Sequence, residues 1–152
     1  MSKRINPYAR MDLFQPLIDY SKTLPEVGLE HSLLHLVKIR ASQINGCAVC
    51  LVMHTQEARQ DGETEMRIYL LDGWREAPHF TPRERAALAW TEALTRLDHA
   101  GNDAAYELVA AEFNEAEQVA LTLAIGNINL WNRINVGFQV APPRSAAIKV
   151  AA

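Results

Sequence analysis

The sequence is organised around residues 43–54, Gln-Ile-Asn-Gly-Cys-Ala-Val-Cys-Leu-Val-Met-His, which contain both cysteines of the chain. Cys47 and Cys50 are three positions apart, and His54 follows four positions after the second cysteine. The preceding pair, Asn45-Gly46, favours a tight turn because both residues tolerate positive φ. Apolar residues recur with helical spacing on both sides of this turn. The pattern therefore predicts a helix, a turn and a second helix that begins with the dithiol.

This placement of the dithiol has chemical consequences. A helix N-terminus carries unpaired N–H groups and a partial positive charge, so it favours a thiolate over a thiol. A spacing of three residues brings the sulfurs of Cys47 and Cys50 to nearly the same face, within reach of a disulfide. His54 lies one turn after Cys50, where its imidazole can take or return a proton. These are the parts of a peroxide-reducing or disulfide-exchanging centre.

Length, composition and charge narrow the class of protein. A chain of 152 residues with 49% apolar and 22% charged residues is expected to form a single soluble domain over residues 1–152. The net charge of −3 gives no basic field for nucleic acid or for a membrane surface. No run is apolar enough for a signal peptide or a membrane span, so we expect a cytoplasmic protein. In that compartment a Cys-x-x-Cys pair indicates redox or metal chemistry rather than a structural disulfide.

Helical periodicity recurs along the whole chain, and no segment alternates as a strand would. We therefore expect an all-α, single-domain bundle of six to eight helices. The expected helices cover 11–20, 29–45, 47–61, 65–71 and 81–97, one that begins at Asp103, and a long one over 119–134. Thr81-Pro82-Arg83-Glu84 and Asn114-Glu115-Ala116-Glu117 each fit a capping box, which marks a helix start. Pro16 is expected to interrupt the first helix or to lie in its first turn.

The last long helix is apolar nearly all round, as Ala120, Leu121, Leu123, Ala124 and Ile125 show. Such a helix is buried on most of its sides. It is either the central helix of the core or a helix that packs against another subunit. We interpret it as an indication of a homo-oligomer.

Two segments resemble a known family. Residues 36–50, Leu-Val-Lys-Ile-Arg-Ala-Ser-Gln-Ile-Asn-Gly-Cys-Ala-Val-Cys, together with His54 and with residues 85–95, Arg-Ala-Ala-Leu-Ala-Trp-Thr-Glu-Ala-Leu-Thr, resemble the alkylhydroperoxidase D-like core of the carboxymuconolactone decarboxylase superfamily. The resemblance covers about residues 30–100. It implies an all-helical fold that assembles as trimers or hexamers. It also implies a thiol peroxidase of antioxidant defence, or a relay that passes reducing equivalents to a partner peroxiredoxin. We expect no bound cofactor. The partners it implies are a small-molecule peroxide and an external thiol or dithiol donor of the peroxiredoxin or lipoyl-protein class.

The resemblance also implies roles for the motif residues. The cysteine at Cys50 attacks the peroxide and becomes a sulfenic acid, Cys47 closes the disulfide, and His54 serves as proton relay. The residues alone leave the choice of sulfur open. The helix dipole favours Cys47 by about 0.3–1 kcal/mol, whereas a nearby base at His54 favours Cys50 through a rate effect of about 10²–10⁴. With the resemblance added, we predict that Cys50 attacks.

The sequence departs from the family pattern at two positions. The best-studied family type has a glutamate twelve residues before the first cysteine, where this chain has His35, and a histidine where it has Val49. We expect His54 to be supported either by His35 itself or by a carboxylate from another helix. Glu84 fits the capping box, so Glu92 is the expected carboxylate; it lies among apolar residues, where a charge needs a partner.

Two other interpretations of the dithiol stay open. Cys47, Cys50 and His54, with His31 or His35, could bind zinc, although three ligands within two helical turns suit a tetrahedral ion poorly. Alternatively, the dithiol could belong to a non-catalytic redox sensor or a redox-regulated chaperone. A sensor would form the same disulfide but would show no turnover with any reductant.

Overall fold

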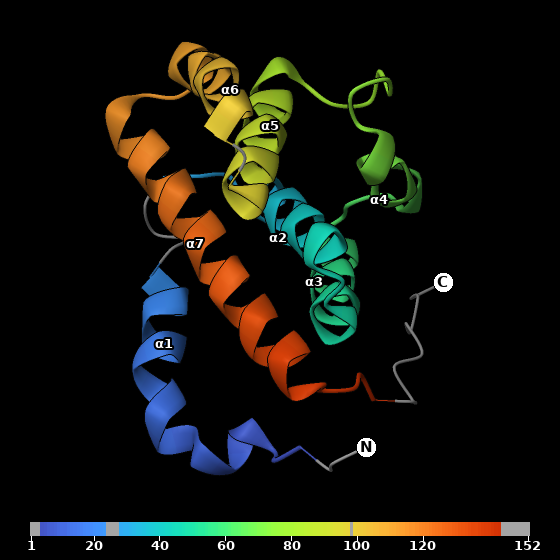
Figure 1. Cartoon of the computed structure of the whole chain (residues 1–152). Coiled ribbons are helices and arrows are strands. Elements are labelled where there is room, and N and C mark those ends of the chain that lie inside the picture. Colours follow the sequence, from blue (N-terminus) through green and yellow to red (C-terminus); the bar gives the residue numbers. More distant parts are fainter. Residues whose placement is uncertain (1–3, 24–27, 98, 144–152) are drawn as a thin grey trace.

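The computed structural model describes residues 4–23, 28–97 and 99–143. These residues form α-helices and short 3-10 helices and contain no strand, which confirms the all-α prediction (Figure 1). None of the helices in these ranges is both long and apolar enough to cross a membrane. In chain order the elements are η1 (Pro7–Arg10), α1 (Met11–Thr23), α2 (His31–Asn45), α3 (Ala48–Gln60), α4 (Glu65–Leu70), η3 (Leu71–Gly73), α5 (Pro82–Arg96), α6 (His99–Glu112) and α7 (Glu115–Phe138).

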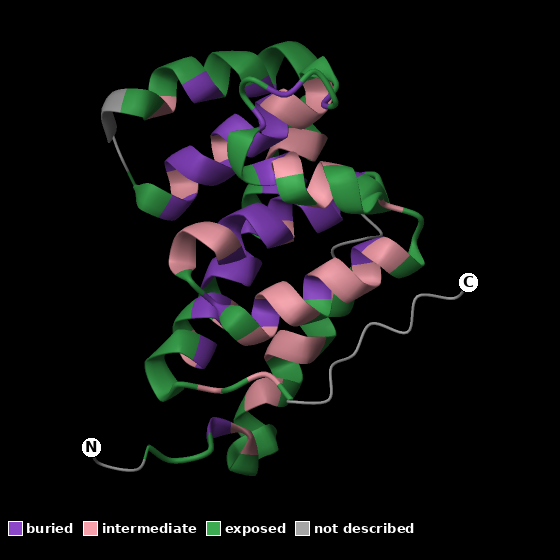
Figure 2. Cartoon of the chain, turned by 90° about the vertical axis from the view of Figure 1, so that its right-hand side faces the viewer, coloured by how far each residue is buried: buried purple, intermediate pink, exposed green. Residues whose placement is uncertain are grey.

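Helix α2 is the centre of the bundle, because α3, α5 and α7 all pack against it. Its residues Leu36, Val37 and Ile39 are fully buried. Figure 2 shows the buried residues concentrated in the middle of the bundle and the exposed ones on its outer surfaces. In Figure 1, α7 runs diagonally across the molecule with α1 beside it. Helix α2 is therefore packed on several sides, and the turn between α2 and α3 fixes the position where α3 begins.

Both predicted capping boxes are present. The Thr81 hydroxyl accepts a hydrogen bond from the Glu84 N–H, and the Glu84 carboxylate accepts one from the Thr81 N–H at 2.8 Å. Asn114 and Glu117 make the same reciprocal pair at the start of α7, at 3.0 and 2.9 Å. Each box satisfies two N–H groups that a helix start leaves without a partner. The starts of α5 and α7 are therefore encoded locally.

Several details of the helices differ from the sequence prediction, and α7 (Glu115–Phe138) extends beyond the expected 119–134 at both ends. Pro16 lies inside α1 rather than interrupting it. It stands on the exposed side of the helix, where water can reach the carbonyl that its missing N–H leaves without a partner. Helix α6 begins at His99, four residues before the expected cap at Asp103. A residue type that favours caps can also lie within a helix, so Asp103 alone did not mark the boundary.

Helix α7 is not apolar on all its sides. The prediction that it would be was based on residues 120–125 in its N-terminal half, so it is corrected here. Its N-terminal half contributes Ala120, Leu121, Ala124 and Ile125 to the core, as expected. Its C-terminal half carries four buried asparagines: Asn127, Asn129, Asn132 and Asn135. Each is hydrogen-bonded to another side chain, as buried amides require. Of the four, Asn135 contacts a cysteine.

Candidate active site

The two cysteines lie at the turn between α2 and α3. Gly46 ends α2 with a φ of 66°, a left-handed conformation that glycine adopts without steric cost. Cys47 is the N-cap of α3, and its sulfur accepts a hydrogen bond from the Cys50 N–H at 3.3 Å. Cys47 and Cys50 form a disulfide with their Cα atoms 5.3 Å apart. The predicted turn therefore presents both sulfurs at the positive end of a helix.

His54 lies one turn after Cys50 and is paired with a carboxylate on its own helix. Its Nδ1 is 2.8 Å from the carboxylate of Glu57, and the residue is only 6% exposed. Burial lowers the pKa of His54, an effect that the hydrogen bond and charge of Glu57 partly offset. The hydrogen bond from His54 lowers the pKa of Glu57. At neutral pH the pair is therefore a neutral imidazole that donates from Nδ1 to a carboxylate, and its Nε2 keeps a free lone pair.

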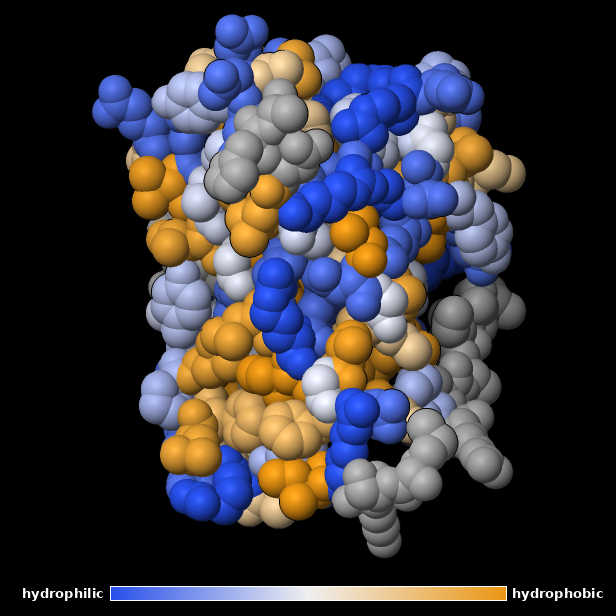
Figure 3. All heavy atoms as spheres, in the orientation of Figure 1, coloured by the Kyte–Doolittle hydropathy of each residue, from blue (hydrophilic) through white to orange (hydrophobic). Residues whose placement is uncertain are grey.

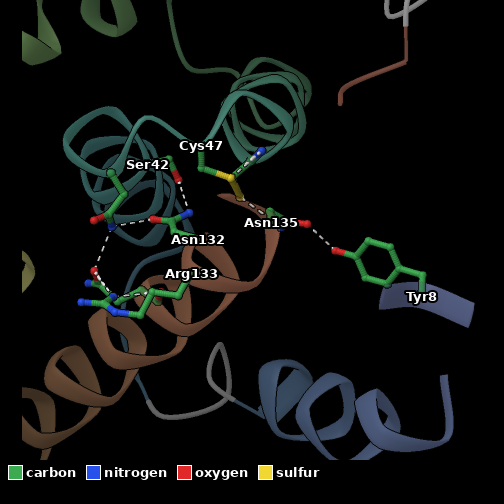
Figure 4. The surroundings of a disulfide bond; sticks show 9 residues. Tyr8, Ser42, Cys47, Asn132, Arg133 and Asn135 are labelled. Atoms are coloured by element: carbon green, nitrogen blue, oxygen red, sulfur yellow. Dashed lines mark hydrogen bonds between the residues drawn. A yellow bond between two sulfur atoms is a disulfide. The ribbon is translucent and has the colours of Figure 1, made fainter. Parts of the chain in front are cut away.

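A series of hydrogen-bonded side chains from the N-terminal segment and from α7 also reaches Cys50 (Figure 4). The Asn135 amide nitrogen donates to Cys50 Sγ at 3.4 Å. The amide oxygen of the same residue accepts a hydrogen bond from the Tyr8 hydroxyl at 2.6 Å. The tyrosine fixes the amide so that its N–H groups face the sulfur. These three residues are far apart in the sequence, and no local pattern links them.

A cavity of about 350 Å³ opens beside Cys50. Several polar side chains line the cavity: Tyr8, Ser21, Lys22, Lys38, His54, Glu57, Asn127 and Asn135. Its apolar walls come from α1, α3 and α7 and consist of Ile18, Val49, Met53, Ile128 and Trp131. The volume and the mixture of apolar wall with a few polar groups are typical of small-molecule sites.

The structure does not bring His35 into this cavity. Its Nε2 lies 2.6 Å from the carboxylate of Asp61. It lines a different cavity, together with Ser32, Ala58 and Arg67. The position that carries a glutamate in the family type is therefore paired with an acid of its own here. This pairing turns His35 toward Asp61 and corrects the expectation that it orients His54.

Glu92 is also remote from the cysteines, which corrects the expectation that it supports His54. It is 2% exposed, and its carboxylate accepts hydrogen bonds from four side chains. The donors are Arg40 at 2.8 Å, Trp74 at 2.9 Å, Arg75 at 2.6 Å and Arg96 at 2.9 Å. Burial alone would raise the pKa of Glu92, but the hydrogen bonds from Trp74, Arg75 and Arg40, together with the charge of Arg40, lower it to about 2. The expectation that a buried carboxylate needs a partner was right, but the partners are arginines and a tryptophan.

The carboxylate that does contact His54 was missed in the sequence. Glu57 follows His54 by three positions, and residues at this spacing are neighbours on a helix. The pair was therefore readable from the sequence. Asn135 and Tyr8 were missed for a different reason, since only the tertiary fold brings them to Cys50.

The structure gives no support to the zinc interpretation. Within the described ranges, no group of three or more histidine, cysteine, aspartate or glutamate side chains is placed to hold a metal ion. Cys47 and Cys50 are bonded to each other, and His54 is paired with Glu57.

Comparison with known proteins decides the family. Residues 11–93 match the Carboxymuconolactone decarboxylase family. The protein YdfG of Bacillus subtilis (strain 168) is 38% identical over 138 residues, which cover 90% of this chain and 94% of that protein. The chain belongs to the carboxymuconolactone decarboxylase family. The matched residues include the dithiol, His54 and Glu57, whereas Tyr8 and Asn135 lie outside the matched segment.

Solved structures of other proteins show the same fold. The Agrobacterium tumefaciens protein ATU0492, described as of unknown function and as a candidate antioxidant defence protein AhpD, is 44% identical with a TM-score of 0.87, over 93% of this chain and 99% of that one. The debrominase Bmp8, solved in complex with 2,3,4-tribromopyrrole, is 16% identical with a TM-score of 0.81, over 91% of this chain and 74% of that one. The second likeness concerns the fold alone. The resemblance to the AhpD-like core of this superfamily is confirmed.

Proposed function

We propose that this protein is a thiol-dependent peroxidase that reduces organic hydroperoxides in antioxidant defence. One observation carries the proposal: a Cys47–Cys50 disulfide stands at a helix start, beside a cavity that also holds a neutral histidine. The likeness to ATU0492, for which a role in antioxidant defence was suggested, supports the same activity. We also propose a cytoplasmic location, because a reducing compartment returns the disulfide to the dithiol that reacts with peroxide.

The cycle begins with the reduced dithiol. The Cys50 thiolate attacks one oxygen of the hydroperoxide, the O–O bond breaks, and Cys50 becomes a sulfenic acid while an alcohol leaves. Cys47 then attacks the Cys50 sulfur, which forms the disulfide and releases water. The two cysteines thereby give two electrons to the peroxide. An external thiol or dithiol returns two electrons and two protons to the pair.

His54 is suited to move the protons of this cycle. Its Nε2 takes the proton of the Cys50 thiol, and the resulting imidazolium can return it to the alkoxide that leaves. Glu57 holds the ring through Nδ1 and stabilises the imidazolium that forms. A neutral histidine with an oriented ring is the form that this role requires.

The cavity indicates the class of peroxide. Its walls of Ile18, Met53, Ile128 and Trp131 favour an apolar substituent on the hydroperoxide. Such a substituent would bury its apolar surface against α1 and α7 while the peroxide group lies at Cys50. We therefore expect an alkyl or aryl hydroperoxide to react faster than hydrogen peroxide.

Steady-state turnover tests the proposal. The assay follows the consumption of cumene hydroperoxide with dithiothreitol as reductant, at several enzyme concentrations. We expect turnover that is proportional to enzyme and faster than with hydrogen peroxide at equal concentration. If the peroxide drives disulfide formation but no reductant supports turnover, the protein is a redox sensor and not a peroxidase.

Glu57→Gln is expected to lower the turnover rate on the order of tenfold, a part of the 10²–10⁴ that a general base contributes in total. Glu57 raises the pKa of His54 and burial lowers it, so loss of the carboxylate lowers that pKa further. A rate that needs the neutral imidazole falls as the pH drops through this pKa. The acid limb of the pH–rate profile should therefore move to lower pH. The control is Glu107→Gln, which changes an exposed residue of α6. If the acid limb does not move in Glu57→Gln, the protonation of His54 does not determine the rate.

We also propose that the protein is a homo-oligomer, a trimer or hexamer as the family resemblance implies. Apolar residues gather over the part of the surface where α1 and α7 lie (Figure 3). Val119, Leu123 and Leu130 of α7 lie on one side of the helix and are 59%, 45% and 46% exposed. We call this row the α7 seam. Exposed apolar side chains that share one side of a helix are typical of a subunit contact.

Charges in the α7 seam should dissociate the oligomer. The variant Leu123→Glu/Leu130→Glu would bring repelling, desolvated carboxylates into the contact, so we expect a monomer by sedimentation velocity where the wild type is larger. Leu108→Glu changes a leucine of α6 that is 50% exposed and serves as the control. A wild-type protein that is itself monomeric would refute the subunit contact.

A further inference from the structure

Lys38 is the one residue between Leu33 and Ser42 that is not buried. The other residues of this stretch of α2 lie in the centre of the bundle, where the helix packs against α3, α5 and α7. Lys38 is half-buried and contributes to the wall of the cavity beside Cys50, which we call the Cys50 cavity. The central helix therefore contributes a cation to the candidate site at the single position where this stretch is open.

Arg40, the other cation of the same stretch, shows what such a position requires. Its guanidinium group pairs with Glu92 at 2.7 Å and also with Asp72. None of the ion pairs formed within residues 4–23, 28–97 and 99–143 includes Lys38. An ammonium group that is partly removed from water loses hydration, and an ion pair with a carboxylate offsets that loss. A ligand that brings an anion would supply this offset to Lys38.

The acids near Lys38 are already engaged by histidines. Glu57 lies 2.8 Å from His54 Nδ1, and its pKa is lowered chiefly by that hydrogen bond and further by the charge of Lys38. Asp61 lies 2.6 Å from His35 Nε2, and the same two causes lower its pKa in the same order. Both carboxylates are therefore close enough to respond to the ammonium charge, but their hydrogen bonds go to the imidazole rings.

The second lysine of the Cys50 cavity, Lys22 of α1, is placed differently. Its side chain is 71% exposed, and its Nζ lies 3.8 Å from the carboxylate of Asp19. Exposed pairs of this kind contribute little to binding or stability, because water solvates both charges. Lys38 is therefore the cation of this cavity that would gain most from an anionic ligand.

We propose that the hydroperoxide reduced by this protein carries a carboxylate, which pairs with the Lys38 ammonium group while the peroxide group lies at Cys50. This inference rests on the proposed function and names the substrate class and the residue that selects it. The carbon skeleton between the two polar ends would contact the apolar walls formed by Met53, Ile128 and Trp131. The carboxylate takes no part in the redox step, so electrons and protons move as described above.

The charges of the cavity favour a carboxylate over a phosphate monoester. Its described lining contains two ammonium groups, and Glu57 supplies the only carboxylate of that lining. With a neutral His54, these groups leave one positive charge for a ligand to balance. A carboxylate brings one negative charge, whereas a phosphate monoester brings about 1.5–2 at neutral pH. A monoanionic acid therefore fits the site.

A matched pair of substrates tests the proposal by steady-state kinetics. The two are cumene hydroperoxide with a carboxylate in the para position of its ring, and the methyl ester of that compound, which lacks only the charge. A hydrogen-bonded charge pair should change affinity about tenfold. We therefore expect the wild type to show a kcat/KM about tenfold higher for the carboxylate, through a lower KM.

Three lysine variants locate the origin of this preference. Lys38→Met should reduce it to less than about twofold, because the side chain keeps its length and loses its charge. Lys38→Arg, which keeps a cation, should retain most of it, and Lys22→Met should weaken it less than Lys38→Met does. If Lys38→Met slows both substrates equally, so that the preference stays at the wild-type value, Lys38 does not select the carboxylate and the inference is overturned.

A binding measurement separates this inference from the peroxidase proposal. Para-isopropylbenzoate and its methyl ester lack the peroxide group, and calorimetric titration into the oxidised protein compares their affinities. We expect the benzoate to bind about tenfold more tightly in the wild type and about equally in Lys38→Met. Equal affinities in the wild type would overturn the inference. If neither hydroperoxide is reduced, the proposed function fails, and the binding difference still decides whether Lys38 selects a carboxylate.

Discussion

Cys50→Ser is expected to abolish hydroperoxide turnover, because no sulfur of the dithiol then faces the cavity that contains His54. Cys47→Ser should also stop steady-state turnover, but for another reason. In that variant Cys50 can still attack the peroxide, yet no second sulfur can close the disulfide. One equivalent of alcohol should form and a sulfenic acid should accumulate on Cys50, which a dimedone-type reagent traps and mass spectrometry locates.

The two cysteine variants control for each other, since both remove the disulfide and one hydroxyl replaces one thiol in each. If the two variants lose the same amount of stability, a difference in trapped sulfenic acid between them reflects the roles of the two sulfurs. A sulfenic acid trapped in Cys50→Ser and absent in Cys47→Ser would reverse the assigned roles and make Cys47 the attacking residue.

Glu92→Leu is expected to lower the free energy of unfolding by about 3–5 kcal/mol, as removal of one partner of a buried ion pair does. Arg40 has a side chain that is 6% exposed, and Glu92 is its buried partner at 2.7 Å. Its other acidic partner, Asp72, is 80% exposed and compensates the charge less well. Urea denaturation of the variant and of wild type measures the change.

The double variant Arg40→Met/Glu92→Leu is the control for this loss. It replaces the buried pair by apolar side chains, so much of the lost stability should return. Below its unfolding midpoint, folded Glu92→Leu should keep wild-type turnover, because its carboxylate lies outside the Cys50 cavity. A loss of turnover together with unchanged stability would restore Glu92 to the catalytic machinery.

The part of the site that lies within one sequence segment could be predicted. The turn at Asn45-Gly46, the helix start at Cys47 and the position of His54 depend on neighbours in the chain, and local rules describe them. The Glu57 partner obeys the same rules, since it lies three residues after His54 on the same helix. The family pattern pointed instead to a glutamate before the cysteines, and this chain places its carboxylate after them.

The residues contributed by other elements could not be predicted. Asn135 is 85 positions from Cys50, and Tyr8 is 127 positions from Asn135. Both meet the sulfur only because α7 and the N-terminal segment pack beside the start of α3. Glu92 shows the same limit. The surrounding sequence indicated a buried and paired carboxylate, but only the fold reveals that its partner is Arg40 and not His54.

The measurement that tests the peroxidase assignment most directly is the stoichiometry of a single turnover. Fully reduced protein is mixed with cumene hydroperoxide in the absence of any donor, and the alcohol and the Cys47–Cys50 disulfide are quantified together. We predict one molecule of alcohol for each disulfide formed, and neither product from Cys50→Ser. Hydroperoxide that persists unchanged beside a protein that stays reduced would contradict a peroxidase centred on this dithiol.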